Sequence, residues 1–374
     1  MENIYTKNGL QRVINASGRM TKLGVSTISE GVGEALLDAA GNYVLIDSLF
    51  EFAGKRIGEL IGAKDACVTN SASAGISLSV ASLICGNDIT KVHHLYEVIN
   101  RIQRREVIML KGHNVDYGAP VAEMVQLAGG RIVEAGFANG SKIEDIAGMV
   151  NENTLAILFV KSHHCVQKEM VGVEEVVAFA NEKGIPCIID AAAEEDLSKY
   201  IAMGADFVCY SGAKAIQGPT SGFVACKTEE LAQNMRLQYK GIGRAMKIGK
   251  EGVMGLVRAI EEYLAGQRTD AVGKSDMEGF TERIGKVPGC TAALIQDEAG
   301  REIYRTKITF DPDVYGWTAK DVVKKLQEGD TAVYTRDYQA NLGSIAIDPR
   351  PLVNKEELAF IENRIIEIGK EKKN

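Results

Sequence analysis

Short apolar runs alternate with amphipathic stretches through the middle of the 374-residue chain. The runs near 106–110, 154–160 and 185–191 are almost wholly apolar, and the stretches between them carry apolar residues at helical spacing. Strands that are apolar on both faces belong to a sheet covered by helices on both sides. The alternation therefore predicts the α/β class, with right-handed β-α-β units and a mostly parallel, seven-stranded sheet.

The pattern changes after a long helix predicted near 249–264. Alternating strands and two helices follow between 291 and 368, which indicates a small α+β domain. The start of the chain is rich in Gly, Ser and Thr and has the character of an arm without its own core. We expect an N-terminal arm over 1–30, a large domain over 31–250 and a small C-terminal domain over 251–374.

Charge, cysteine spacing and the length of apolar runs indicate where the protein is located and which partners it does not bind. A net charge of -7 and a pI of about 5.5 give no general electrostatic affinity for nucleic acid or an anionic membrane. The seven cysteines are dispersed and never spaced C-x-x-C, which is typical of buried, reduced thiols in the cytosol. No apolar run reaches the roughly 18 residues of a membrane helix, and the N-terminus has no apolar signal segment. We expect a cytoplasmic protein that binds neither nucleic acid nor membrane.

Lys214 lies among small residues in YSGAKAIQGPTSG, directly after a predicted strand. An amine that forms a Schiff base with a cofactor needs small neighbours and surroundings that lower its pKa. A glycine-rich turn that merely exposes a lysine would have the same composition. The turn by itself leaves both interpretations open.

Asp190 ends the apolar strand IPCIID, one helix and one strand before Lys214. Open α/β sheets bind ligands at the carboxyl ends of their strands, so these two residues are expected on neighbouring strand ends. A carboxylate there can keep the pyridine nitrogen of pyridoxal 5′-phosphate (PLP) protonated, which makes the ring an electron sink. Asp190 could instead cap the next helix, but its combination with Lys214 favours a PLP site.

Small and hydroxyl residues begin a predicted helix after the strand ACVTN. Backbone N–H groups and the helix dipole bind phosphate at such a position, and serine hydroxyls add donors. An N-cap before a closely packed helix is the alternative. We expect a PLP phosphate site formed by Ser71, Ala72, Ser73 and Ala74, with Ser211 as a further hydroxyl near Lys214.

Two histidine-containing segments, KGHN and KSHH, also follow apolar strands. His113 could stack on the pyridine ring or assist catalysis as an acid, and His163 is a further candidate for cofactor binding. The adjacent His163 and His164 point apart on an extended segment and have no partner at i, i+4. We therefore predict no metal site.

Taken in order, these motifs resemble one known family. QRVINASG, NSASAGI, KGHN, IIDAAAE, SGAKAIQGP and GRAMKIGKEGVMGL resemble segments of bacterial selenocysteine synthase (L-seryl-tRNA selenium transferase), collinear over most of the chain. The resemblance implies the aspartate-aminotransferase fold (PLP fold type I), with Lys214 as the Schiff-base lysine and Asp190 at the pyridine nitrogen. It also implies a homodimer or larger homo-oligomer, because sites of this fold type usually form between subunits.

The chain departs from selenocysteine synthase at its N-terminus. That enzyme has an additional N-terminal domain for tRNA, whereas the RVINASG motif begins here at Arg12. The shorter members of the superfamily look like D-glucosaminate-6-phosphate ammonia-lyase, and this sequence resembles that group. This resemblance implies a PLP-dependent ammonia-lyase that forms 2-keto-3-deoxy-6-phosphogluconate through aldimine formation, removal of the Cα proton and loss of the C3 hydroxyl.

A small anionic substrate of this kind needs cationic partners. Lys247 and its neighbours Arg244 and Lys250 in GRAMKIGK are expected on one helix face. Each candidate could equally be a solvated surface charge. The remaining candidates are Arg19 in the arm and Arg336 or Arg350 in the small domain.

Three other functions stay open at this point. The chain could be another PLP-dependent β-eliminase or aldolase acting on an amino acid. It could transfer selenium to seryl-tRNA, or it could bind PLP without catalysis. Ammonia release from an amino-sugar acid would separate these alternatives.

Overall fold

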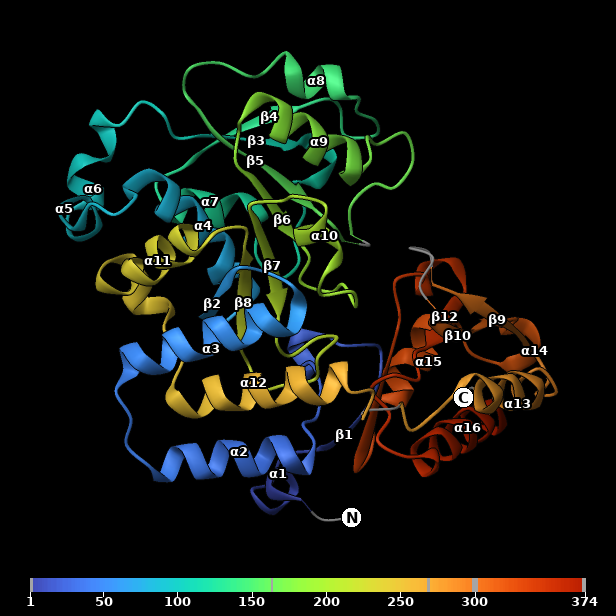
Figure 1. Ribbon diagram of the computed structural model, residues 1–374. Helices are drawn as coiled ribbons and strands as arrows, with labels where there is room; N and C mark the ends of the chain where they lie inside the picture. The colour runs from blue at the N-terminus through green and yellow to red at the C-terminus, as the bar shows by residue number, and fades with distance from the viewer. Residues whose placement is uncertain (1–2, 163, 268–269, 298–301, 372–374) are drawn as a thin grey trace. The chain divides into compact units, whose positions relative to one another are not determined.

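The computed structural model describes residues 3–162, 164–267, 270–297 and 302–371 (Figure 1). The chain divides into two compact units. The larger unit comprises residues 28–267, and the smaller unit comprises 1–27 together with 268–374.

This division differs from the predicted boundaries in two places. The N-terminal segment belongs to the smaller unit, and the larger unit ends at 267 instead of 250. Helix α12 (Lys250–Leu264) explains the second difference, because it packs against α2 (Glu30–Gly41) and α3 (Ile46–Ile61) of the larger unit. Figure 1 shows these three helices layered together.

A seven-stranded sheet forms the centre of the larger unit, in the order β2-β8-β7-β6-β5-β3-β4. Strand β8 runs antiparallel to β2 and β7, and the remaining neighbours pair in parallel. The predicted mostly parallel sheet of seven strands is therefore confirmed. Its strands are β2 (Asp65–Thr69), β3 (Glu106–Leu110), β4 (Arg131–Ala135), β5 (Thr154–Val160), β6 (Cys187–Asp190), β7 (Phe207–Ser211) and β8 (Gly222–Cys226).

Two apolar cores lie on opposite faces of this sheet. Successive side chains of a strand point to opposite faces; in β6, Cys187 and Ile189 join one core and Ile188 joins the other. The first core is covered by α3, α12, α8 (Ile143–Ala147), α9 (Val173–Lys183) and α10 (Lys199–Ala202). The second is covered by α4 (Ala72–Cys85), α5 (Ile89–His93), α6 (Leu95–Val98), α7 (Val121–Leu127) and α11 (Glu229–Leu237).

Short 3-10 turns connect these elements at several points. They are η2 (Ile99–Arg101), η3 (Lys111–His113), η4 (Gln238–Lys240) and η5 (Ile242–Met246) in the larger unit, and η1 (Thr21–Leu23) and η6 (Ala340–Leu342) in the smaller one. None of the helices in the described residues is both long and apolar enough to cross a membrane. All seven cysteines are buried free thiols, as predicted.

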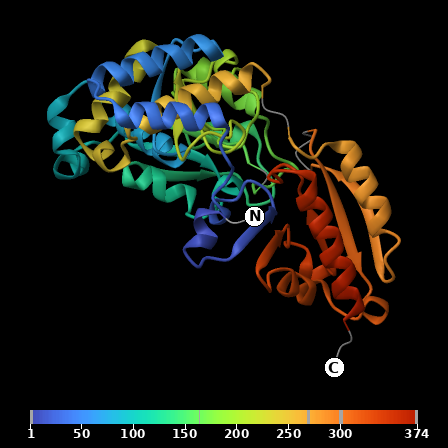
Figure 2. The same cartoon turned by 90° about the horizontal axis from the view of Figure 1, so that it is seen from below.

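The smaller unit is an α+β structure, as predicted. Strands β12 (Ser344–Ile347), β10 (Tyr304–Phe310) and β9 (Cys290–Gln296) form an antiparallel sheet, and β1 (Arg12–Ala16) pairs in parallel with β11 (Thr331–Thr335). The helices are α1 (Ile4–Lys7), α13 (Lys274–Ile284), α14 (Pro312–Tyr315), α15 (Ala319–Leu326) and α16 (Lys355–Lys370), and Figure 2 shows α13 in orange and α16 in red.

Strand β1 explains why the N-terminal segment belongs to the smaller unit. Its Ile14 and Ala16 are buried in the same apolar core as Phe280 of α13 and Ile361 of α16. The segment was predicted to lack a core of its own, and it instead completes the core of a domain built from the other end of the chain.

A buried ion pair fixes the edge strand that leads to α4. Arg236 of α11 donates to both carboxylate oxygens of Asp65 at 2.7 and 3.1 Å and to the Ala66 carbonyl at 3.0 Å. The Asp65 side chain is only 2% exposed. Gly54 of α3 completes the enclosure, because a Cβ there would lie 2.3 Å from the Ala66 carbonyl oxygen. Helices α3 and α11 are thus both tied to the start of β2.

The substitution Arg236→Met is expected to destabilise the protein by about 3–5 kcal/mol, because it leaves a buried carboxylate without its counter-charge. Denaturant-induced unfolding measures this loss. Lys199→Met is the control, since the exposed Lys199–Glu174 pair at 3.5 Å is of a kind that contributes about 1 kcal/mol at most. Equal losses in the two variants would contradict the structural role of Arg236.

Candidate active site

Asp190 is the last residue of β6 and lies beside Cys209 of β7 in parallel register. Its carboxylate is buried, and Oδ1 accepts a hydrogen bond from the Ala192 N–H at 3.1 Å. Burial raises the pKa of Asp190, and the positive charge of Lys214 opposes that rise. The two residues predicted to share a cofactor are therefore close enough for their charges to interact.

A tight loop between β7 and β8 holds Lys214. The Gly212 N–H donates to the Ser221 carbonyl at 2.9 Å, and the Gly218 N–H donates to the Gly212 carbonyl at 2.7 Å. A Cβ at Gly212 would lie 2.1 Å from the Ser221 hydroxyl oxygen, and one at Gly218 would lie 2.9 Å from the Ala259 Cβ. The glycines of this turn thus allow the loop to close on itself and to pack on α12.

The start of α4 is the predicted phosphate site. Ser71 is its N-cap and accepts a hydrogen bond from the Ala74 N–H at 3.1 Å. The N–H groups of Ala72 and Ser73 occupy the first two helical positions, which have no acceptor within the helix. A Cβ at Gly222 would lie 2.7 Å from the Ala72 nitrogen, so β8 passes directly against this turn. Of the four predicted residues, Ala72 and Ser73 have backbone donors to offer a phosphate.

Tyr117, in the loop after η3, belongs to the same neighbourhood and was not predicted. Its hydroxyl is buried and has no hydrogen-bond partner of good geometry among the described residues. Burial raises the pKa of Tyr117 to about 12; the nearby Ser73 side chain lowers it and the negative charge of Asp190 raises it.

A buried hydroxyl without a partner costs about 1–3 kcal/mol, and such groups are rare in native proteins. The orphaned Tyr117 hydroxyl therefore indicates a polar ligand at this position. Together with two backbone donors, a buried carboxylate and a lysine, it fits a phosphorylated pyridine cofactor.

His113 ends η3, and its ring is buried against Phe159 of β5, edge-on, with 4.5 Å between ring centroids. Nδ1 accepts a hydrogen bond from the Val160 N–H at 3.2 Å, which places the proton of the neutral ring on Nε2. Burial and the charge of Lys161 lower the pKa of His113 to about 4. The ring is therefore neutral near pH 7, which fits a packing or donor role better than the predicted role as an acid.

Ser211 and His163 were also predicted to bind the cofactor, and the structure describes only the first of them. Ser211 ends β7 and is half-buried, and its N–H bonds to the Ala192 carbonyl at 3.4 Å, close to Asp190. His163 lies outside the described residues.

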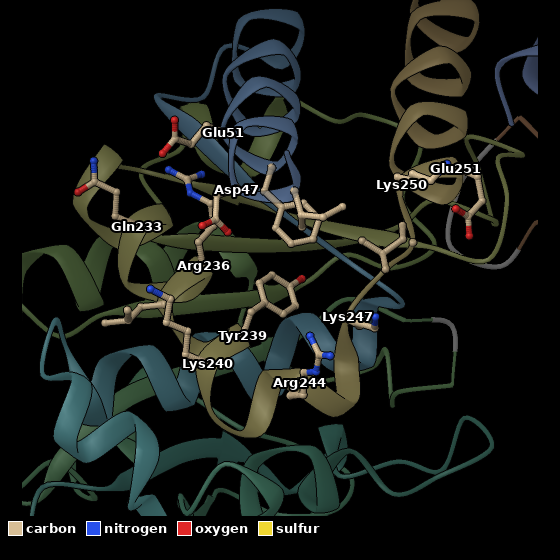
Figure 3. A pocket seen from close by; sticks show the side chains of 15 residues that line it. Asp47, Glu51, Gln233, Arg236, Tyr239, Lys240, Arg244, Lys247, Lys250 and Glu251 are labelled. Carbon is tan, nitrogen blue, oxygen red and sulfur yellow. The ribbon is translucent and has the colours of Figure 1, made fainter. Parts of the chain in front are cut away.

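Arg244, Lys247 and Lys250 line one pocket of about 770 Å³ in the larger unit (Figure 3). They do not share a helix face, because Arg244 lies in η5, Lys247 is extended and Lys250 begins α12. The side chains of Arg244 and Lys247 are exposed.

Lys250 differs from its predicted role in substrate binding. Its ammonium donates to the carbonyls of Ala39, Ala40 and Asn42 at 2.5–2.6 Å. These carbonyls end α2, where a positive charge is stabilised by the helix dipole. The three donors of Lys250 are thus used in joining α12 to α2, and we assign it a structural role.

The other predicted cations lie in the smaller unit, where Asp348 is fully buried. Arg305 donates to Asp348 and to Asp297 at 2.7 Å each, and Arg350 donates to both oxygens of Asp348 at 2.8 and 3.0 Å. Burial would raise the pKa of Asp348, but Arg350 and Arg305 outweigh it and hold that pKa well below its usual range. Arg19 lies 3.7 Å from Asp270.

Arg336 differs from these arginines, because it forms no ion pair with a carboxylate among the described residues. Burial lowers its pKa, the positive charge of Arg305 adds to that effect, and the negative charge of Asp348 opposes it. Its neighbour Thr335 has a buried hydroxyl without a hydrogen-bond partner in the described part of the chain. A partly buried guanidinium of this kind is suited to binding an anion.

Comparison with known proteins decides the family. Residues 13–274 match the family of L-seryl-tRNA selenium transferase. The chain belongs to this family. It is 44% identical to the D-glucosaminate-6-phosphate ammonia lyase of Salmonella typhimurium over 98% of both sequences. A solved structure of D-glucosaminate-6-phosphate ammonia-lyase matches with a TM-score of 0.91 and 43% identity, covering 99% of both chains.

Two further matches widen this comparison. The 5'-C-glycyluridine monooxygenase-decarboxylase of a Streptomyces species is 38% identical over 93% of this chain and 88% of that protein. The aspartate aminotransferase of Thermotoga maritima matches with a TM-score of 0.56 at 17% identity, over 97% of this chain and 93% of that one. The aspartate-aminotransferase-like fold is thereby confirmed, and both the selenium transferase and the aminotransferase families are PLP-dependent.

His113 is expected to make stability depend on pH between about 4 and the unfolded value near 6.5. The unfolded state binds more protons in this window, so the stability of the wild type falls as the pH is lowered through it. The loss is about 3 kcal/mol at most, because a tenfold change in proton affinity corresponds to about 1.4 kcal/mol.

In His113→Phe this contribution is absent, so denaturant unfolding at pH 7 and pH 4 should show a smaller loss for the variant than for the wild type. His94→Phe, at an exposed position, is the control and should follow the wild type. A His113→Phe variant with the full pH dependence would show that the buried imidazole is not its source.

Proposed function

We propose that this protein is a PLP-dependent ammonia-lyase that converts D-glucosaminate 6-phosphate to 2-keto-3-deoxy-6-phosphogluconate and ammonia. The 44% identity with the Salmonella enzyme over nearly the whole chain supports this assignment. The observation that carries it in the structure is the buried Asp190 at the end of β6, near enough to Lys214 in the loop after the neighbouring strand β7 for their charges to interact. Selenium transfer to seryl-tRNA has weaker support, since those relatives are about 27% identical over shorter spans.

The residues at the sheet edge would divide the binding of PLP among them. The Lys214 amine would hold the cofactor covalently, and the N–H groups of Ala72 and Ser73 would bind its phosphate. Asp190 would face the pyridine nitrogen, where a positive charge compensates for the buried carboxylate. When bound, PLP supplies a protonated ring that takes up the electron pair of a broken Cα–H bond.

Lys214 would also carry the proton transfers. Once the substrate amine has displaced it from the cofactor, its amine is the base that removes the Cα proton. The ammonium so formed is the acid that protonates the departing C3 hydroxyl, and water leaves. The Lys214 amine would then return to the cofactor and release the substrate nitrogen as an enamine. Its tautomerisation and hydrolysis give the 2-keto acid and ammonia, so the water lost in the first stage is regained in the second. His113, being neutral, would position the reacting groups through its ring and its Nε2 proton.

The substrate is a small molecule with a carboxylate and a phosphate, and we propose that Arg336 binds one of these groups. Its guanidinium has the forked geometry that suits both anions. Arg19, Arg244, Lys247 and Arg350 remain candidates for the other anionic group.

We further infer that the protein is cytoplasmic and acts as a homo-oligomer without nucleic-acid or membrane partners. Large apolar side chains are exposed at the end of α2 and in the segment before α3. Apolar surface of this kind is typical of a subunit interface. The residues are Leu37, Tyr43, Val44, Leu45 and Ile46.

The purified protein with PLP and D-glucosaminate 6-phosphate should release equal amounts of ammonia and 2-keto acid without consuming oxygen. Lys214→Ala should lose activity by at least roughly 10²–10⁴-fold, because base and acid are removed together. Lys183→Ala, on the exposed end of α9, is the control and should match the wild type. Oxygen uptake with this substrate, no ammonia, or an active Lys214→Ala variant would each refute the proposed reaction.

Arg336→Met should raise the KM for the phosphorylated substrate about 10–100-fold, since hydrogen bonds to charged groups contribute about 1.5–3 kcal/mol. Arg336→Lys should recover only part of this loss, because an ammonium cannot bind an anion with two parallel bonds. Steady-state kinetics measure both variants. Arg283→Met, which removes an exposed pair with Glu362, is the control, and a KM unchanged in Arg336→Met would exclude Arg336 from substrate binding.

A further inference from the structure

Tyr117 is the buried polar group near the proposed cofactor site that the sequence motifs do not account for. We propose that its hydroxyl donates a hydrogen bond to the phosphate of the cofactor and completes the phosphate site begun by Ala72 and Ser73. This inference rests on the proposed function, because it presupposes PLP. It adds a third donor from a different element of the fold.

The loop that carries Tyr117 is held in place by its own hydrogen bonds. The Gly118 N–H donates to the Asp116 carboxylate at 2.7 Å, and the Val121 N–H donates to the Val115 carbonyl at 3.1 Å. Gly118 has a φ of 115°, which favours glycine and lets the chain reverse after Tyr117. The backbone on both sides of Tyr117 is thus held by hydrogen bonds within the loop.

The loop is also tied to the helix that would bind the phosphate. It continues into α7, whose Met124 carbonyl accepts a hydrogen bond of 2.7 Å from the Ser77 hydroxyl of α4. Ser77 lies one turn after Ser73, the residue of the α4 start that Tyr117 approaches. This bond connects α7, which follows the loop, to the helix whose start would bind the phosphate.

The chemistry of the neighbours favours a phosphate over the other polar groups of a cofactor. Tyr117 lies beside Ser73 at the N-terminus of α4, where backbone N–H groups and the helix dipole favour an anion. Its high pKa keeps the phenol protonated at neutral pH, so it can only offer its proton to an anion there. An anion at this point would give the buried hydroxyl the partner of good geometry that it lacks among the described residues.

The test compares Tyr117→Phe with the wild type after removal of PLP from both holoenzymes. Titration with PLP, followed by absorbance, should give a dissociation constant about 10–100-fold higher for the variant, the range for a hydrogen bond to a charged group. Titration with pyridoxal, which lacks the phosphate, should give equal constants for both proteins. Tyr315→Phe is the matched control, since it removes a buried hydroxyl that bonds to the Ile365 carbonyl at 2.6 Å in the smaller unit.

Thermal unfolding provides a second measurement. Without ligand, Tyr117→Phe should be as stable as the wild type or more so, because the deleted hydroxyl has no partner of good geometry in the described part of the chain, while Tyr315→Phe should be less stable. Inorganic phosphate should protect Tyr117→Phe only at roughly tenfold or higher concentration than the wild type, since protection follows the dissociation constant.

Three outcomes would overturn the inference. Equal PLP affinity in Tyr117→Phe and the wild type would remove Tyr117 from the site. An equal loss of pyridoxal affinity would place the hydroxyl against the ring instead of the phosphate. Failure of the wild type itself to bind PLP would refute the proposed function and this inference with it, and is distinguishable because it precedes any comparison with the variant.

Discussion

A carboxylate buried at the end of a β-strand requires a positive charge beside it, and Asp190 imposes this requirement on the whole site. Leaving it ionised and unpaired in an apolar setting would cost several kcal/mol. Lys214 supplies part of the compensation, because its charge opposes the effect of burial on the pKa of Asp190. A protonated pyridine nitrogen would supply the remainder, which is why the site is better suited to a cationic ring than to a neutral ligand.

The sheet brings three parts of the chain together around Asp190: the end of β6, the loop after β7 and the start of α4. Parallel register between β6 and β7 sets the end of one strand beside the loop that follows the other. The antiparallel β8 then returns from that loop and passes the start of α4, with Gly222 too close to the helix for any side chain. Lys214, Asp190 and the start of α4 are therefore positioned by strand pairing and glycine packing, and not by the loops alone.

The sequence was informative where function depends on strand ends and poorly informative where it depends on tertiary contacts. Asp190 and Lys214 could be found because each follows an apolar strand, and strand ends of a parallel sheet converge. The bonding of Lys250 to the end of α2 could not be predicted, because its carbonyl acceptors lie more than 200 residues away along the chain. Tyr117 has no motif, and its importance comes only from the burial of one oxygen. The boundary near 250 was misplaced because the apolar face of α12 does not reveal which domain it covers.

The family contains relatives whose names describe an ammonia lyase, a selenium transferase and a monooxygenase-decarboxylase. A shared fold does not fix the reaction, so the differences must reside in groups that contact the substrate. In the proposed mechanism, Asp190, Lys214 and the start of α4 would serve the cofactor and would impose no choice of substrate. The cations, by contrast, differ in how far their charge is already satisfied. Lys250 donates to three carbonyls, while Arg336 forms no ion pair with a carboxylate among the described residues. The charge of Asp348 is near enough to raise the pKa of Arg336 but forms no ion pair with it among the described residues. We therefore propose that Arg336 is the residue at which selection for an anionic substrate is expressed.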